Sequence, residues 1–87
     1  LVSSRMMEYI EFDEGHFAVV KMRPPREIQG FTLAEAKVRE KYGVTIVGIK
    51  SPGRDFTYAE PTTRVGKQDL LIVAGNVELL SRFAGRP

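Results

Sequence analysis

The sequence has no cysteine, no tryptophan and a single histidine among its 87 residues. The missing cysteines exclude disulfides, thiolate zinc sites and cysteine nucleophiles, and they suit a reducing compartment. Long hydrophobic runs are also missing, because the longest, residues 70–74, is far shorter than the ~20 residues that a membrane-spanning helix needs. We therefore expect no direct insertion into a membrane and no chemistry that depends on a thiol.

The sequence also lacks a strong excess of charge of either sign. The 13 basic and 11 acidic side chains leave a net charge of +2, and the basic residues are scattered from Arg5 to Arg86. Nucleic acid is therefore an unlikely partner. The length allows one domain, whose small core would bury only ~60–65% of the surface of the unfolded chain and would often be completed by a second subunit. We expect a homodimer.

The first half of the chain predicts a hairpin followed by a helix. Alternating apolar residues in 9–12 and 16–22 predict two paired strands, and Pro24 with Pro25 ends the second. Thr32 and Glu35 have the spacing of a capping box, and Gly43 can end a helix over residues 32–42. The aromatic residues of this half are expected in the core: Tyr9, Phe12, Phe17 and Phe31.

The second half predicts three strands and a closing helix. Residues 44–50 are almost continuously apolar, which favours a strand buried on both faces, and 55–58 and 70–74 supply two more. Asn76 caps a final short helix with Leu79, Leu80 and Phe83 on its apolar side. The order β-β-α-β-β-β-α describes a two-layer α+β domain, with two helices covering a mainly antiparallel sheet. We place it at residues 9–84, with 1–8 as a linker or artificial remnant and 85–87 as a tail.

No set of residues predicts catalysis. His16 lies beside the expected hairpin turn with Asp13 and Glu14, where a solvated surface role is the simpler interpretation. The glycines have no phosphate-loop spacing, and no cluster suits a metal. We therefore expect no enzyme and no catalytic or metal-binding residue.

Binding is the remaining role. Lys50 and Arg54 bracket the turn at 51–53, and the ring of Tyr58 could meet a base. An apolar patch is expected near them, formed by Ile46, Val47 and Pro61. The alternatives are solvated hairpin charges for the cations, and core packing or a dimer interface for the patch.

Four segments together resemble one family, the C-terminal domain of RCK proteins, also called TrkA-C. The first two are Gly30-x-Thr32-Leu33-Ala34-Glu35 and Val38-Arg39-x-Lys41-Tyr42-Gly43-Val44-x-Ile46-Val47-Gly48-Ile49. Asp69-Leu70-Leu71-Ile72-Val73-x-Gly75 and Leu79-Leu80-x-Arg82-Phe83 complete the likeness, which covers most of the chain. One departure is that Gln68 stands where the family usually has a glycine before the aspartate.

The resemblance implies a cytosolic regulatory domain of a TrkA/Ktr-type potassium uptake protein, located at the inner face of the membrane with a membrane-embedded transporter subunit. It implies an upstream Rossmann-type RCK domain that binds NAD or ATP, so no dinucleotide cofactor is expected here. In such families the dimer cleft can bind cyclic di-AMP. Ile46, Val47 and Pro61 would then contact adenine or sugar, Lys50 and Arg54 would face phosphates, and Tyr58 would stack.

Two other functions stay open. The domain could be a dimerisation and docking module that binds no ligand. It could also be a small nucleic-acid-binding domain, although Glu35 and Glu40 interrupt its basic surface. The cations of that surface would be Arg23, Arg26, Lys37, Arg39 and Lys41.

Overall fold

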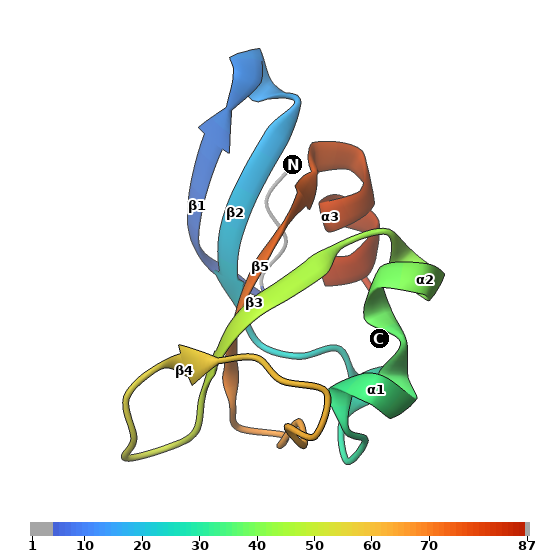
Figure 1. The fold of residues 1–87 in the computed structure, drawn as a ribbon. Helices are drawn as coiled ribbons and strands as arrows, with labels where there is room; N and C mark the ends of the chain where they lie inside the picture. The colour runs from blue at the N-terminus through green and yellow to red at the C-terminus, as the bar shows by residue number, and fades with distance from the viewer. Residues whose placement is uncertain (1–4, 87) are drawn as a thin grey trace.

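The structure, a computed structural model, describes residues 5–86. A sheet of five strands has the order β1-β2-β5-β3-β4, and all its neighbours are antiparallel. The strands are β1 (Met6–Phe12), β2 (Phe17–Met22), β3 (Thr45–Lys50), β4 (Thr57–Tyr58) and β5 (Leu70–Asn76). The helices are α1 (Leu33–Ala36), α2 (Val38–Tyr42) and α3 (Val77–Ala84), and one-turn 3-10 helices lie at Asp13–Gly15 and Arg26–Ile28. The predicted α+β class and order of elements are confirmed, except that the first predicted helix is divided into α1 and α2 (Figure 1).

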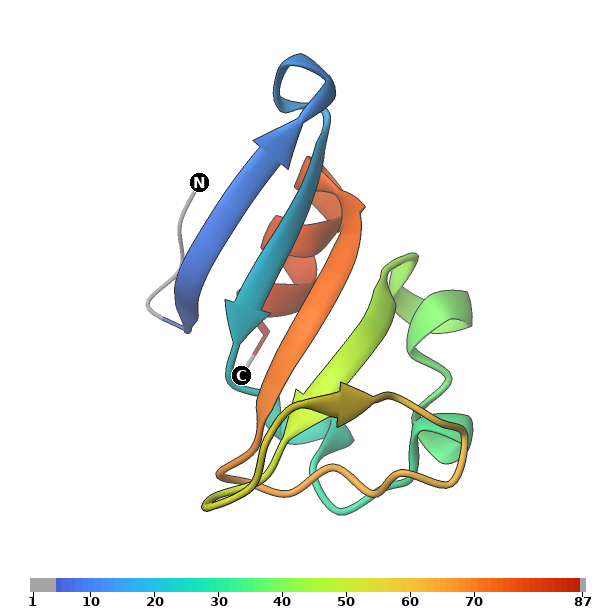
Figure 2. The ribbon, with the colours of Figure 1, turned by 60° about the vertical axis from the view of Figure 1, so that its left-hand side comes forward.

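The central strand β5 organises the core. It is hydrogen-bonded to β2 on one side and to β3 on the other, so it joins the two halves of the sheet. Its alternate residues Leu71 and Val73 are buried, together with Val20 opposite Val73. Helix α3 covers this face, and α1 and α2 lie beside β3 (Figures 1 and 2). Leu80 and Phe83 of α3 are completely buried, as its apolar stripe predicts.

The opposite face of the sheet carries exposed apolar side chains, which corrects the expected core. Phe12 and Phe17 face each other in the β1–β2 register and are 51% and 43% exposed, because both point away from the helices. Phe31, just before α1, is 49% exposed, and only Tyr9 of the four packs against the core. Strand β3 is likewise not covered on both faces, since Val47 is 46% exposed.

The helix expected over residues 32–42 is interrupted. Thr32 and Glu35 form the predicted capping box, but Lys37 has φ 49° and ψ 48°, a left-handed conformation that ends α1 and precedes α2. In one continuous helix, Ala36 and Val38 would point about 200° apart. Both are buried, and the break allows both to face the core. The prediction of a single helix is therefore wrong, because a continuous helix would not turn both Ala36 and Val38 toward the core.

Residues at both ends of the described chain are part of the fold. β1 begins at Met6, which is buried, and the Arg5 guanidinium donates to the carbonyl oxygens of Ala84 and Arg86. Arg86 in turn forms an ion pair with Glu27 at 2.9 Å. The folded structure thus extends beyond both ends of the expected domain, residues 9–84. Residues 1–4 of the expected linker and residue 87 of the expected tail lie outside the described part.

Replacement of Lys37 by glycine should stabilise the domain. A left-handed residue with a side chain costs about 1–2 kcal/mol, and glycine avoids this at an entropic cost of about 0.5–1 kcal/mol. We expect Lys37→Gly to raise the free energy of unfolding by about 0.5–1 kcal/mol in urea titrations. Lys41→Gly, in the helical part of α2, is the matched control and should lower it by about 1 kcal/mol. Equal destabilisation by both variants would contradict strain at Lys37.

Candidate ligand-binding site

An apolar hollow lies between α1, α2, the start of β3 and the chain that follows β4. Its volume is about 270 Å³. We call it the apolar hollow, and its lining residues are Leu33, Ala34, Lys37, Val38, Arg39, Glu40, Val44, Thr45, Ile46, Ala59, Glu60 and Pro61.

Backbone hydrogen bonds hold the walls of the apolar hollow together. The first amides of α1, which have no partner within the helix, donate to the loop after β4: Leu33 N–H to the Thr63 oxygen at 2.9 Å and Ala34 N–H to the Pro61 oxygen at 3.0 Å. The same loop is attached to β3 by the Ala59 N–H, which donates to the Val47 oxygen at 3.1 Å. Helix, loop and strand therefore form one hydrogen-bonded frame before any ligand binds.

The rim of the apolar hollow carries charges of both signs. Lys37 and Arg39 are exposed, and neither forms an ion pair within residues 5–86. Glu40 and Glu60 add two carboxylates to the same lining. An apolar floor with two available cations suits a ligand that combines a flat apolar group with a phosphate.

The six residues predicted from the sequence do not line one site. Ile46 and Pro61 both line the apolar hollow. Val47 and Tyr58 line a different depression of about 550 Å³, on the uncovered face of the sheet. Lys50 lines a third hollow and lies over the Phe56 ring at 5.8 Å, while Arg54 is exposed in the turn and lines none of the three. The expected proximity of Lys50 and Arg54 to the apolar patch is therefore not found.

Sequence reasoning missed several lining residues. Leu33, Lys37 and Arg39 lie in the helix predicted over residues 32–42, and nothing in that prediction marks them as the lining of a recess. The recess depends on the break at Lys37, which no glycine or proline marks in the sequence.

The capping box beside the apolar hollow sets the ionisation of Glu35. Its carboxylate accepts from the Thr32 N–H at 2.9 Å, and the Thr32 hydroxyl accepts from the Glu35 N–H at 3.2 Å. The backbone bond from Thr32 is the main reason that the pKa of Glu35 lies below its ordinary value, helped by the Thr32 side chain and by Arg64. The carboxylate is thus held ionised at the start of α1.

Residues 5–86 contain no group of three or more histidine or acidic side chains placed to hold a metal ion. No helix among them has the length and apolarity to cross a bilayer.

The family follows from fold and sequence together. Residues 18–85 match the TrkA-C domain. The chain therefore belongs to the TrkA-C family, a regulatory domain family of potassium transport systems, as its motifs predict.

Two curated relatives come from Bacillus subtilis (strain 168). Ktr system potassium uptake protein C is 34% identical over 86 residues, which cover 99% of this chain and 38% of that protein. Ktr system potassium uptake protein A is 26% identical and covers 95% of this chain and 37% of that protein. The chain thus spans less than two fifths of the length of these relatives.

Solved structures support the same fold. One is the RCK C domain of the potassium transport protein KtrA in complex with cyclic di-AMP, with a TM-score of 0.66 and 27% identity, covering 76% of this chain and 78% of that one. Another is the GsuK channel bound to NAD, with a TM-score of 0.68 and 33% identity, covering 80% of this chain and 13% of that one.

Loss of the capping box should move the titration of Glu35. The lowered pKa means that Glu35 contributes stability above its unfolded pKa, and that this contribution is lost as the pH falls through the folded pKa. In Thr32→Ala the backbone N–H at position 32 remains and only the hydroxyl is lost, so we expect the NMR midpoint of Glu35 to rise part of the way toward its ordinary value. The free energy of unfolding should fall by about 1 kcal/mol at neutral pH, because the cap is lost. Thr57→Ala should leave the Glu35 midpoint unchanged. A Glu35 midpoint that is the same in Thr32→Ala and in the unsubstituted chain would contradict this account.

Proposed function

We propose that this chain is the ligand-binding regulatory domain of a potassium uptake system and that it binds cyclic di-AMP in the apolar hollow, between two copies of the domain. The observation that carries the proposal is the lining: Ile46 and Pro61 offer apolar surface, and beside it lie Lys37 and Arg39, which form no ion pair within residues 5–86. The likeness to a KtrA C domain in complex with cyclic di-AMP supports the same ligand.

The size of the apolar hollow favours half a ligand per copy. Its 270 Å³ lies just below the ~300–1,000 Å³ typical of a complete small-molecule site. Cyclic di-AMP has two equivalent halves, each with one adenine and one phosphate. A two-fold ligand fits a two-fold interface, in which each copy holds one half.

The charges of the lining orient the ligand. Arg39 presents a planar guanidinium that can donate two parallel hydrogen bonds to phosphate, and Lys37 adds a second positive charge. Glu40 and Glu60 would repel a phosphate, whereas their oxygens can accept from the amino group of adenine. The phosphate therefore belongs on the Lys37 and Arg39 side, with the base against Leu33, Ile46 and Pro61.

Regulation would follow from the interface. A ligand shared by two copies favours the arrangement in which both halves of the site are complete, so it shifts the population toward one dimer geometry. That geometry would be passed to a membrane-embedded transporter subunit, on the cytoplasmic side of the membrane. An upstream RCK domain that binds NAD or ATP belongs to the same proposal, and a GsuK channel bound to NAD supports it.

Calorimetric titration with cyclic di-AMP tests the proposal. We expect the complete chain to bind and Arg39→Ala to bind at least tenfold more weakly, because a guanidinium bonded to phosphate is lost. Lys50→Ala and Arg54→Ala are matched controls, since neither residue lines the apolar hollow, and should bind within about twofold of the unsubstituted chain. Sedimentation should show a larger dimer fraction when the ligand is present.

Two results would contradict the proposal in different ways. No binding by a dimeric sample would favour the ligand-free docking module. Weaker binding in Lys50→Ala or Arg54→Ala, with Arg39→Ala unaffected, would move the phosphate away from the apolar hollow.

A further inference from the structure

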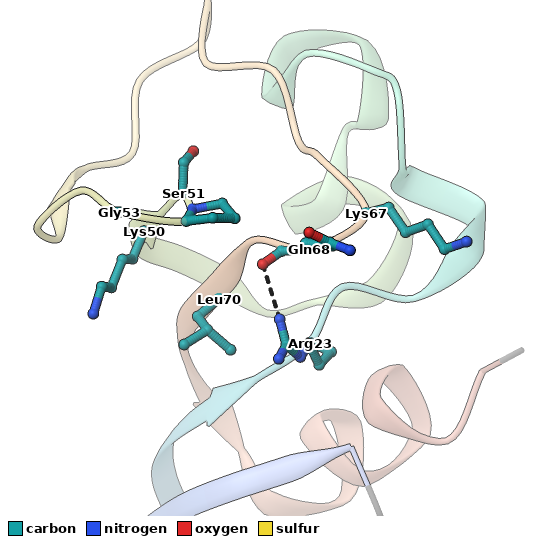
Figure 3. A pocket seen from close by; sticks show the side chains of 8 residues that line it. Arg23, Lys50, Ser51, Gly53, Lys67, Gln68 and Leu70 are labelled. Atoms are coloured by element: carbon teal, nitrogen blue, oxygen red, sulfur yellow. Dashed lines mark hydrogen bonds between the residues drawn. The ribbon is translucent and has the colours of Figure 1, made fainter.

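A basic hollow lies at the other end of β3, where β2 and β3 end and β5 begins (Figure 3). Its volume is about 650 Å³. Its lining residues are Arg23, Lys50, Ser51, Pro52, Gly53, Lys67, Gln68 and Leu70, and none of them lines the apolar hollow.

Three cations from separate segments line the basic hollow, and no acidic residue does. Arg23, Lys50 and Lys67 form no ion pair within residues 5–86. The acidic residue next to this lining, Asp69, is buried and accepts from the Gly66 N–H at 2.7 Å, so its carboxylate is engaged within its own turn. Within the described residues, none of these three cations is therefore neutralised by an ion pair.

The central cation is fixed in place. The Arg23 guanidinium donates from Nη1 to the Gln68 carbonyl oxygen at 2.8 Å, which leaves its other N–H donors available. The two prolines that follow Arg23 are fully buried and restrain the backbone from which it projects. An arginine already held in one orientation loses less conformational freedom when it binds an anion.

The arrangement of the cations indicates the size of the anion. Figure 3 shows Arg23 near the middle, with the Lys50 and Lys67 side chains extending to opposite sides. Cations that point in opposite directions favour an anion with two or more phosphates, which can offer one phosphate to each ammonium group. We propose that the basic hollow binds a small soluble anion that carries at least two phosphate groups, at a site separate from that of cyclic di-AMP.

Phosphate groups also occur on lipid headgroups, so the experiment has two arms. Inorganic triphosphate is titrated into the complete chain by calorimetry. Vesicles of phosphatidylglycerol and phosphatidylcholine in equal parts, and vesicles of phosphatidylcholine alone, are tested by cosedimentation. We expect triphosphate to bind, and its affinity to fall as added salt screens the charges. The double variant Lys50→Gln with Lys67→Gln should bind triphosphate at least tenfold more weakly. The Lys50 and Lys67 side chains form no hydrogen bond within residues 5–86, so the fold should persist, which circular dichroism checks.

The control is Arg82→Gln on the exposed side of α3, which removes a positive charge elsewhere and should change binding less than twofold. No triphosphate binding at millimolar concentration, equal loss in Arg82→Gln, or binding only to the phosphatidylglycerol vesicles would overturn the proposal. Cyclic di-AMP titrated into the double variant should bind normally, so the failure of one site is distinguishable from the failure of the other.

Discussion

The pairing of β5 with both β2 and β3 is the constraint on which the other features depend. β5 comes last among the strands, yet it occupies the middle of the sheet, so the β1–β2 hairpin and the β3–β4 pair are joined only when it is in place. Its buried face supports α3, and the Val44 side chain packs so closely on Gly75 that a Cβ there would lie 3.1 Å from the Val44 Cγ1 atom. The end of α2 and the start of β3 are thereby fixed against the central strand. Both hollows border segments whose positions this strand determines.

The sequence predicts local structure well wherever a residue acts through its own backbone. Thr32 with Glu35 and Asn76 cap their helices as expected, because a capping side chain needs only a neighbouring amide. The break at Lys37 could not be predicted in this way. It satisfies two buried residues, Ala36 and Val38, that contact distant parts of the chain, and it does so without glycine or proline.

The candidate site shows the same division. The sequence predicts one apolar patch of Ile46, Val47 and Pro61. Ile46 and Pro61 line the same hollow, whereas Val47 lies at a register irregularity of β3 and lines a separate depression with Tyr58. Adjacent strand residues point to opposite faces, so an apolar pair in the sequence need not be a patch on the surface. Lys50 and Arg54 are predicted as phosphate contacts because they flank one turn. Their spacing in the sequence cannot show which hollow the end of a flexible side chain reaches.

Ligands in the two proposed sites would act on opposite ends of β3. Ile46 lines the apolar hollow and Lys50 lines the basic hollow, and four residues of strand separate them by about 13 Å. Both ends of β3 are hydrogen-bonded to β5, so the strand cannot move at one end alone without strain in the central pairing. Two ligands would therefore influence each other only through a change that moves the sheet as a body or alters the contact between two copies. Coupling of that kind is reciprocal. An anion that stabilised one dimer geometry would change the affinity for the ligand of the apolar hollow by a certain factor, and that ligand would change the affinity for the anion by the same factor.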